Sequence, residues 1–169
     1  MPLTFSQSDD HLRKVLSVRQ WREANKTAYH AVGMEFENAI KPTKFEASAA
    51  QIYGFKPRSP KYLDRKSLGY VTGRQGQRYP IPHGGTRDLV LTGRLRAAMM
   101  SRHFPRVYPT RVTIQYQSPV SDRGYKYATM RPYKTDHPNL GEELTSVTRE
   151  QLRRLEAIYH DTMQEQVQK

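Results

Sequence analysis

The chain has 169 residues, the length of one ordinary domain, and its hydrophobic content of 36% and mean hydropathy of −0.84 leave room for only a small core. It contains no cysteine, which excludes disulfides, thiolate metal sites and a cysteine nucleophile. The formal net charge is +12, and the excess lies in the middle of the chain, where residues 41–111 hold fifteen Lys and Arg against three Asp and Glu. Such a centre is expected to meet a negatively charged partner.

The ends of the chain carry no targeting pattern. The N-terminus lacks a basic stretch followed by an apolar one, so we expect no secretory signal. No segment approaches the about 20 apolar residues that a membrane span requires. We therefore expect a soluble product assembled inside the cell.

The first predicted element is a long helix over residues 17–40. Ser17 and Gln20 have the spacing of a capping box. Apolar residues then recur at helical spacing: Val18, Trp21, Ala28, Val32, Phe36 and Ala39. Pro42 is expected to end the helix, because its ring clashes with the preceding turn and it has no N–H to donate.

A short helix over residues 44–53 is predicted next, closed by Gly54. The segment 54–88 then shows neither helical nor strand periodicity over most of its length. It is basic, aromatic and rich in proline, which favours a semi-extended arm that can lie along another surface.

A strand, a turn and a helix are predicted after this arm. Residues 88–91, which include the aliphatic run Leu89-Val90-Leu91, fit a short buried strand. Thr92 is the expected N-cap of a helix that runs to about residue 102, and Gly93 permits the sharp turn between them. Leu95, Ala98 and Met99 form the expected inward face.

The last third predicts a hairpin and a final helix. Residues 111–117 alternate polar and apolar side chains, and 125–133 is the expected return strand, followed by a connector over 137–147. The final helix has a capping box at Thr148 and Gln151. Its apolar face is Leu152, Leu155, Tyr159, Met163 and Val167.

These elements predict an α+β fold. A small antiparallel sheet is packed with N-terminal, central and C-terminal helices, and a long basic arm over residues 54–88 belongs to one domain that spans 1–169.

Signals for catalysis are poor. The six histidines are scattered and never take a metal-ligand spacing. Glu142 and Glu143 are adjacent, so their side chains point apart, and acids at a helix start are favoured by the helix dipole alone. Asp122 and Lys126 could belong to the carboxylate–lysine site of a metal-dependent nuclease, but no second acid stands at a suitable spacing. We expect no enzyme activity, no cofactor and no metal site.

The strongest functional signal is the interleaving of cations and tyrosines in the middle of the chain. The contact residues that we expect there and in the following helix are Arg58, Lys61, Tyr62, Arg65, Lys66, Arg74, Arg78, Arg94 and Arg96. Three interpretations stay open. The segment docks onto neighbouring protein subunits, which we favour; it tracks a nucleic-acid backbone through 41–111; or it is a solvated charged loop.

One run of motifs resembles a protein family. The order FEASAAQIYGFKPRSPKYLDRK, DLVLTGRLRAAM, a hairpin and HPNLGEELTSVTREQLRRL is similar to tailed-bacteriophage neck proteins, called head–tail joining, tail-completion or minor tail proteins. The resemblance covers residues 45–155. Its distinctive points are Tyr53-Gly54 before the Pro57-Arg58-Ser59 loop, Tyr62 with Arg65 and Lys66, and the Thr92-Gly93-Arg94-Leu95 turn.

This resemblance implies a structural protein of the virion, assembled in the host cytoplasm. It implies a homo-oligomeric ring, expected to be hexameric, between the head connector and the tail-tube proteins. Double-stranded DNA would pass through the ring without sequence-specific contacts. Neither catalysis nor a membrane is implied, and the place within the neck (adaptor, stopper or tail terminator) is left open.

Overall fold

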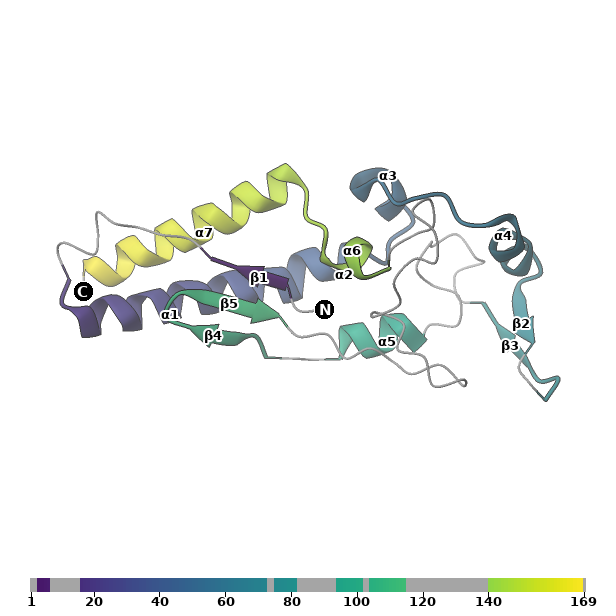
Figure 1. Ribbon diagram of the computed structural model, residues 1–169, viewed down its shortest axis with the longest axis horizontal. Helices are drawn as coiled ribbons and strands as arrows, with labels where there is room; N and C mark the ends of the chain where they lie inside the picture. The colour runs from purple at the N-terminus through teal and green to yellow at the C-terminus, as the bar shows by residue number, and fades with distance from the viewer. Residues whose placement is uncertain are drawn as a thin grey trace. The chain divides into compact units, whose positions relative to one another are not determined.

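The computed structural model describes residues 3–6, 16–72, 75–81, 94–101, 104–114 and 140–168 (Figure 1). The chain divides into two compact units. We call residues 2–40, 102–115 and 147–169 the terminal unit, and residues 41–101 and 116–146 the central unit. Helices with a small antiparallel sheet confirm the predicted α+β class, whereas the assignment of 1–169 to one domain stays a prediction.

The sheet of the terminal unit has the strand order β1-β5-β4, with both pairs antiparallel. Its strands are β1 (Leu3–Phe5), β4 (Arg106–Tyr108) and β5 (Arg111–Ile114). Because β1 and β4 occupy both edges of β5, the predicted pairing of this strand with residues 125–133 is wrong. The return strand itself lies outside the described residues.

Two long helices, α1 (Val18–Glu35) and α7 (Arg149–Val167), lie side by side in the same unit (Figure 1). Both predicted capping boxes are confirmed, at Ser17 and at Thr148. The core is built mainly from α1, its continuation to Ile40, α7 and the inward face of β5: Ala24, Ala28, Tyr29, Val32, Phe36, Ile40, Val112, Ile114, Leu155, Tyr159 and Met163. Two predicted members of the apolar faces, Val18 and Leu152, are instead exposed.

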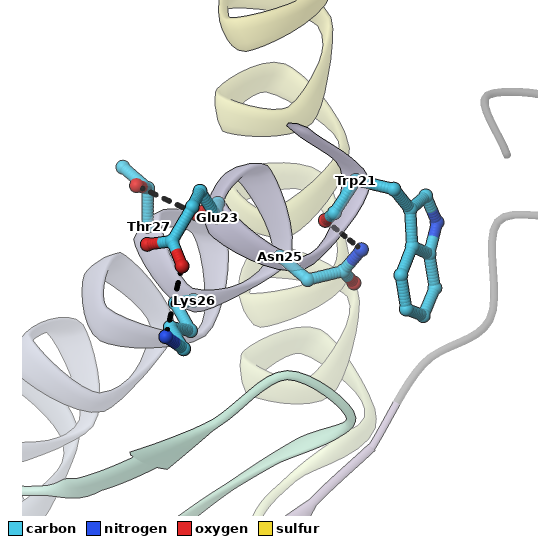
Figure 2. Close-up of polar contacts among 5 residues, drawn as sticks. All are labelled: Trp21, Glu23, Asn25, Lys26 and Thr27. Carbon is cyan, nitrogen blue, oxygen red and sulfur yellow. Dashed lines mark hydrogen bonds and ion pairs between the residues drawn. The ribbon is translucent and has the colours of Figure 1, made fainter. Parts of the chain in front are cut away.

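Three local contacts join polar groups near the start of α1 (Figure 2). The Asn25 side-chain amide donates to the carbonyl of Trp21 over 2.9 Å, and Lys26 pairs with Glu23 at 3.0 Å. The hydroxyl of Thr27 donates to the carbonyl of Glu23. Asn25 is fully buried, so its remaining oxygen must find a partner within the core.

The long helix does not stop at Pro42, contrary to our prediction. It continues as a π-helical turn, η2 (Phe36–Ile40), and then as α2 (Lys41–Thr43), which contains the proline. A π turn is wider than an α turn and accommodates an extra residue. The wider turn directly ahead of Pro42 therefore relieves the clash by which a proline usually breaks a helix.

Besides α2, the described residues of the central unit form four short helices and a two-stranded sheet. The helices are α3 (Ala49–Tyr53), α4 (Pro60–Ser67), α5 (Arg94–Met100) and α6 (Leu140–Thr145), and the strands are β2 (Tyr70–Thr72) and β3 (Arg78–Pro80). Gly54 ends α3 with φ 62°, as predicted. The helix before it is shorter at its start than we expected, and α6 stands where we predicted a connector.

The segment 54–88 contains more regular structure than its sequence suggests. Helix α4 and the β2–β3 hairpin both fall within it. The predicted strand 88–91 and the cap at Thr92-Gly93 lie outside the described residues, while α5 confirms a helix directly after them.

Candidate interaction surface

The basic segment of the central unit is anchored at its start by an ion pair. Arg58 Nη2 lies 2.7 Å from Glu143 Oε2, and the side chains are only 10% and 8% exposed. Arg58 follows the left-handed turn at Gly54, and Glu143 lies in the first turn of α6. The pair thereby ties the beginning of the 54–88 segment to α6. A guanidinium used in this way has little freedom to contact another molecule.

A buried lysine makes a second link to the end of α6. The Lys44 ammonium donates to the backbone carbonyl of Ser146 and, over 3.0 Å, to its hydroxyl. It also lies 3.4 Å from the centre of the Tyr53 ring. The residue is 1% exposed, and this burial lowers the pKa of Lys44 to about 7.

A pocket of about 230 Å³ lies beside these two links. It is lined by Tyr53, Gly54, Phe55, Lys56, Glu142, Glu143 and Ser146. The rings of Tyr53 and Phe55 stack with their centres 5.7 Å apart. The lining combines one lysine with two carboxylates. The pocket is therefore neither uniformly positive nor uniformly negative, and it does not favour a ligand of one charge. Among the described residues, no three His, Asp or Glu side chains come together as a metal site.

Beyond the anchor, α4 and the hairpin expose apolar side chains together with cations. Leu63 is 50% exposed, Leu68 59% and Tyr79 44%. Lys61 and Arg78 are exposed beside them in the sequence. The Arg78 guanidinium lies 4.6 Å from the centre of the Tyr70 ring. We call the exposed residues Lys61, Leu63, Leu68, Arg78 and Tyr79 the α4–hairpin surface; they do not share one face, because Arg78 and Tyr79 are adjacent in β3 and point to opposite sides of the hairpin.

The structure separates the contact residues that the sequence grouped together. Lys61 and Arg78 are exposed, Arg96 is half-buried on α5, and Lys66 is buried at 6% exposure. Tyr62 and Arg65 lie on α4 and Arg94 on α5, but their side chains are outside the description, as is all of Arg74. Lys66 is buried and Arg58 is paired with Glu143, so neither residue is presented for contact with another molecule.

Two features of the central unit were missing from the sequence prediction. Leu63 and Leu68 are apolar residues within a cationic stretch, and that contrast could have marked them. Lys44 carried no such signal, because its partner Ser146 lies 102 positions away in the chain.

No helix in the part of the chain that the structure describes is both long and apolar enough to cross a membrane. Comparisons with known protein families, with curated proteins and with solved structures gave no match.

Proposed function

We propose that this protein is a structural component of a tailed-phage virion neck. It forms a ring that joins the head connector to the tail around the DNA channel, and its basic segment becomes ordered against neighbouring copies. The observation that carries the proposal is the α4–hairpin surface, where half-exposed leucines and a tyrosine accompany cations. The family resemblance of residues 45–155 supplies the context.

Exposed leucines distinguish this surface from a merely solvated charged loop. Burial of one leucine side chain is worth about 1.5–3 kcal/mol, so Leu63 and Leu68 offer a sizeable gain to any protein that covers them. Arginine and tyrosine are the side chains that most often anchor protein interfaces. A head-to-tail contact of this kind, repeated by rotation, closes into a ring without leaving an open surface.

The alternative is a non-specific nucleic-acid-binding protein that uses the basic segment 41–111. The central unit as a whole has sixteen Lys and Arg against seven Asp and Glu, which favours a polyanionic partner. Yet Lys41, Lys44 and Lys66 are buried, and Arg58 is paired with Glu143. Fewer cations are therefore presented by this segment than its sequence implies, which favours the protein interface.

Native mass spectrometry and negative-stain imaging of the purified chain test the proposal. We expect closed rings in the wild type and monomers in the double variant Leu63→Asp with Leu68→Asp, because each new carboxylate would be buried in the contact. The matched control is Val18→Asp with Leu152→Asp, which adds the same charges at exposed apolar positions of the terminal unit.

The control should keep the rings, and circular dichroism should show that both variants remain folded. A wild type that stays monomeric at high concentration, or rings that survive in the Leu63 and Leu68 variant, would contradict the proposal. Duplex DNA binding by the wild type that falls steeply with salt, with a log–log slope of several units, and that is lost in Lys61→Ala with Arg78→Ala would instead support the alternative.

A further inference from the structure

The outward face of the sheet in the terminal unit is basic and aromatic. Because side chains alternate along a strand, the buried Val112 and Ile114 define the face toward α1. The register then places Thr4, Thr113 and Arg106 in one row of the opposite face, and Tyr108 with Arg111 in another. Figure 1 shows α1 passing behind these strands, on the buried side.

The side chains of this outward face are open to solvent. Arg106, Arg111 and Thr4 are exposed, and Tyr108 is 39% exposed. Phe104 stands two residues ahead of Arg106, on the same side by alternation, and is 81% exposed. The residue between them, Pro105, is buried. Phe104 therefore presents an apolar ring to solvent two residues from an exposed arginine.

The charge of this face has one sign. Strands β1, β4 and β5 contain two arginines and no Asp or Glu. The Arg111 guanidinium lies 4.8 Å from the centre of the Tyr108 ring, a cation–π contact that orients it. Cations that contact phosphates beside aromatic rings that stack on bases are the two elements of single-strand recognition.

We infer that this face, formed by Phe104, Arg106, Tyr108 and Arg111, binds a single strand of nucleic acid. The two arginines contact phosphates, and Phe104 provides a platform for a base. A duplex would engage the arginines but leave the phenylalanine without a stacking partner, since its bases are already stacked. The inference does not depend on ring formation, because all four residues belong to one terminal unit.

Fluorescence anisotropy with a labelled oligothymidylate and with a duplex of equal length tests this inference. Replacement of Arg106 and Arg111 by Ala should weaken single-strand binding at least tenfold and reduce the log–log salt slope by about 1.4, which is about 0.7 for each lost phosphate contact. Phe104→Ala should weaken it about fivefold or more while the salt slope stays the same.

The matched control is Arg149→Ala with Arg153→Ala, which removes two exposed arginines of α7 from the same unit. Wild-type affinity in this control, with loss in the sheet variants, supports the inference. It is overturned if the sheet variants bind like the wild type, if only Lys61→Ala with Arg78→Ala weakens binding, or if the duplex binds tighter and Phe104→Ala has no effect. It is also overturned if the sheet variants lose self-association but not DNA binding.

Discussion

The Tyr159 hydroxyl on α7 donates a hydrogen bond of 2.5 Å to Oδ1 of Asn25 on α1, and both side chains are 0% exposed. The Asn25 amide donates in turn to the Trp21 carbonyl. This connection joins two helices that are far apart in the sequence at one defined register. A buried polar pair of this kind is stable only while each member keeps its partner.

Tyr159→Phe should lower the free energy of unfolding of the terminal unit by about 1–3 kcal/mol, because Oδ1 of Asn25 stays buried without a donor. Urea titration monitored by the fluorescence of Trp21, the one tryptophan of the chain, measures the effect. Tyr108→Phe is the matched control, since that ring is 39% exposed, and it should change the free energy by less than about 0.5 kcal/mol. Equal effects of the two changes would refute the role of the buried bond.

Gly33→Ala should destabilise the terminal unit, although alanine favours a helix by about 1 kcal/mol over glycine. A methyl group at Gly33 would lie 2.7 Å from Cβ and 2.8 Å from Cγ of Pro105, and 3.0 Å from a methyl carbon of Val112. The proline ring cannot move aside as a flexible side chain would, so overpacking of about 1–3 kcal/mol outweighs the gain in helix propensity.

Thermal unfolding followed by Trp21 fluorescence measures this change. Thr27→Ala, at an exposed position of the same helix, should leave the midpoint almost unchanged. A raised midpoint for Gly33→Ala would show that α1 and Pro105 are not in close contact.

Three helix ends were predictable from the sequence because their signals are local, whereas the predicted end at Pro42 was wrong. The capping boxes at Ser17 and Thr148 and the left-handed Gly54 each depend on residues within one turn of the chain. The pairing of β1 with β5 was not predictable. With three residues, β1 is too short to show a clear alternation, and its partner strand lies more than a hundred residues away in the chain.

The candidate surface was predictable in composition but not in exposure. The excess of positive charge identified the middle of the chain correctly as unusual, yet charge alone does not distinguish a cation on the surface from one in an ion pair. Arg58 and Lys61 are equivalent in the sequence, but Glu143 pairs only with the first of them. Arg58 is buried in an ion pair and Lys61 is exposed because Glu143, which is distant in the sequence, lies beside Arg58 in the fold.

Lys44 should make the stability of the central unit depend on pH. Its folded pKa of about 7 lies below its ordinary value of 10.5. Between these values the unfolded chain binds more protons than the folded one, so this residue's contribution to stability rises with pH across the window. Below about pH 7 the cost of the buried charge is fully present.

Urea unfolding of the wild type and of Lys44→Met, followed by circular dichroism from pH 6 to pH 10, measures this contribution, because the titration of the other groups cancels in the difference. The wild type should gain stability relative to Lys44→Met as the pH rises from 7 to 10. A difference that does not change with pH would mean that the ammonium is not desolvated.

Arg58→Ala should destabilise the central unit by about 3–5 kcal/mol, because Glu143, whose side chain is only 8% exposed in the wild type, would lose this ion-pair partner. Hydrogen exchange of the α6 amides measures the effect, since the Trp21 signal belongs to the other unit. The double change Arg58→Met with Glu143→Leu should recover most of the stability, because it removes both charges and keeps apolar volume in place.

Lys61→Ala, which removes an exposed cation from α4, is the control and should leave the α6 amides as protected as in the wild type. If Arg58→Ala left α6 equally protected, Arg58 would be free to contact a partner instead of anchoring the segment. An assembly defect in a variant that replaces Arg58 is therefore informative only if the double change with Glu143 shows the same defect. Only the double change removes the guanidinium together with the carboxylate that it pairs with.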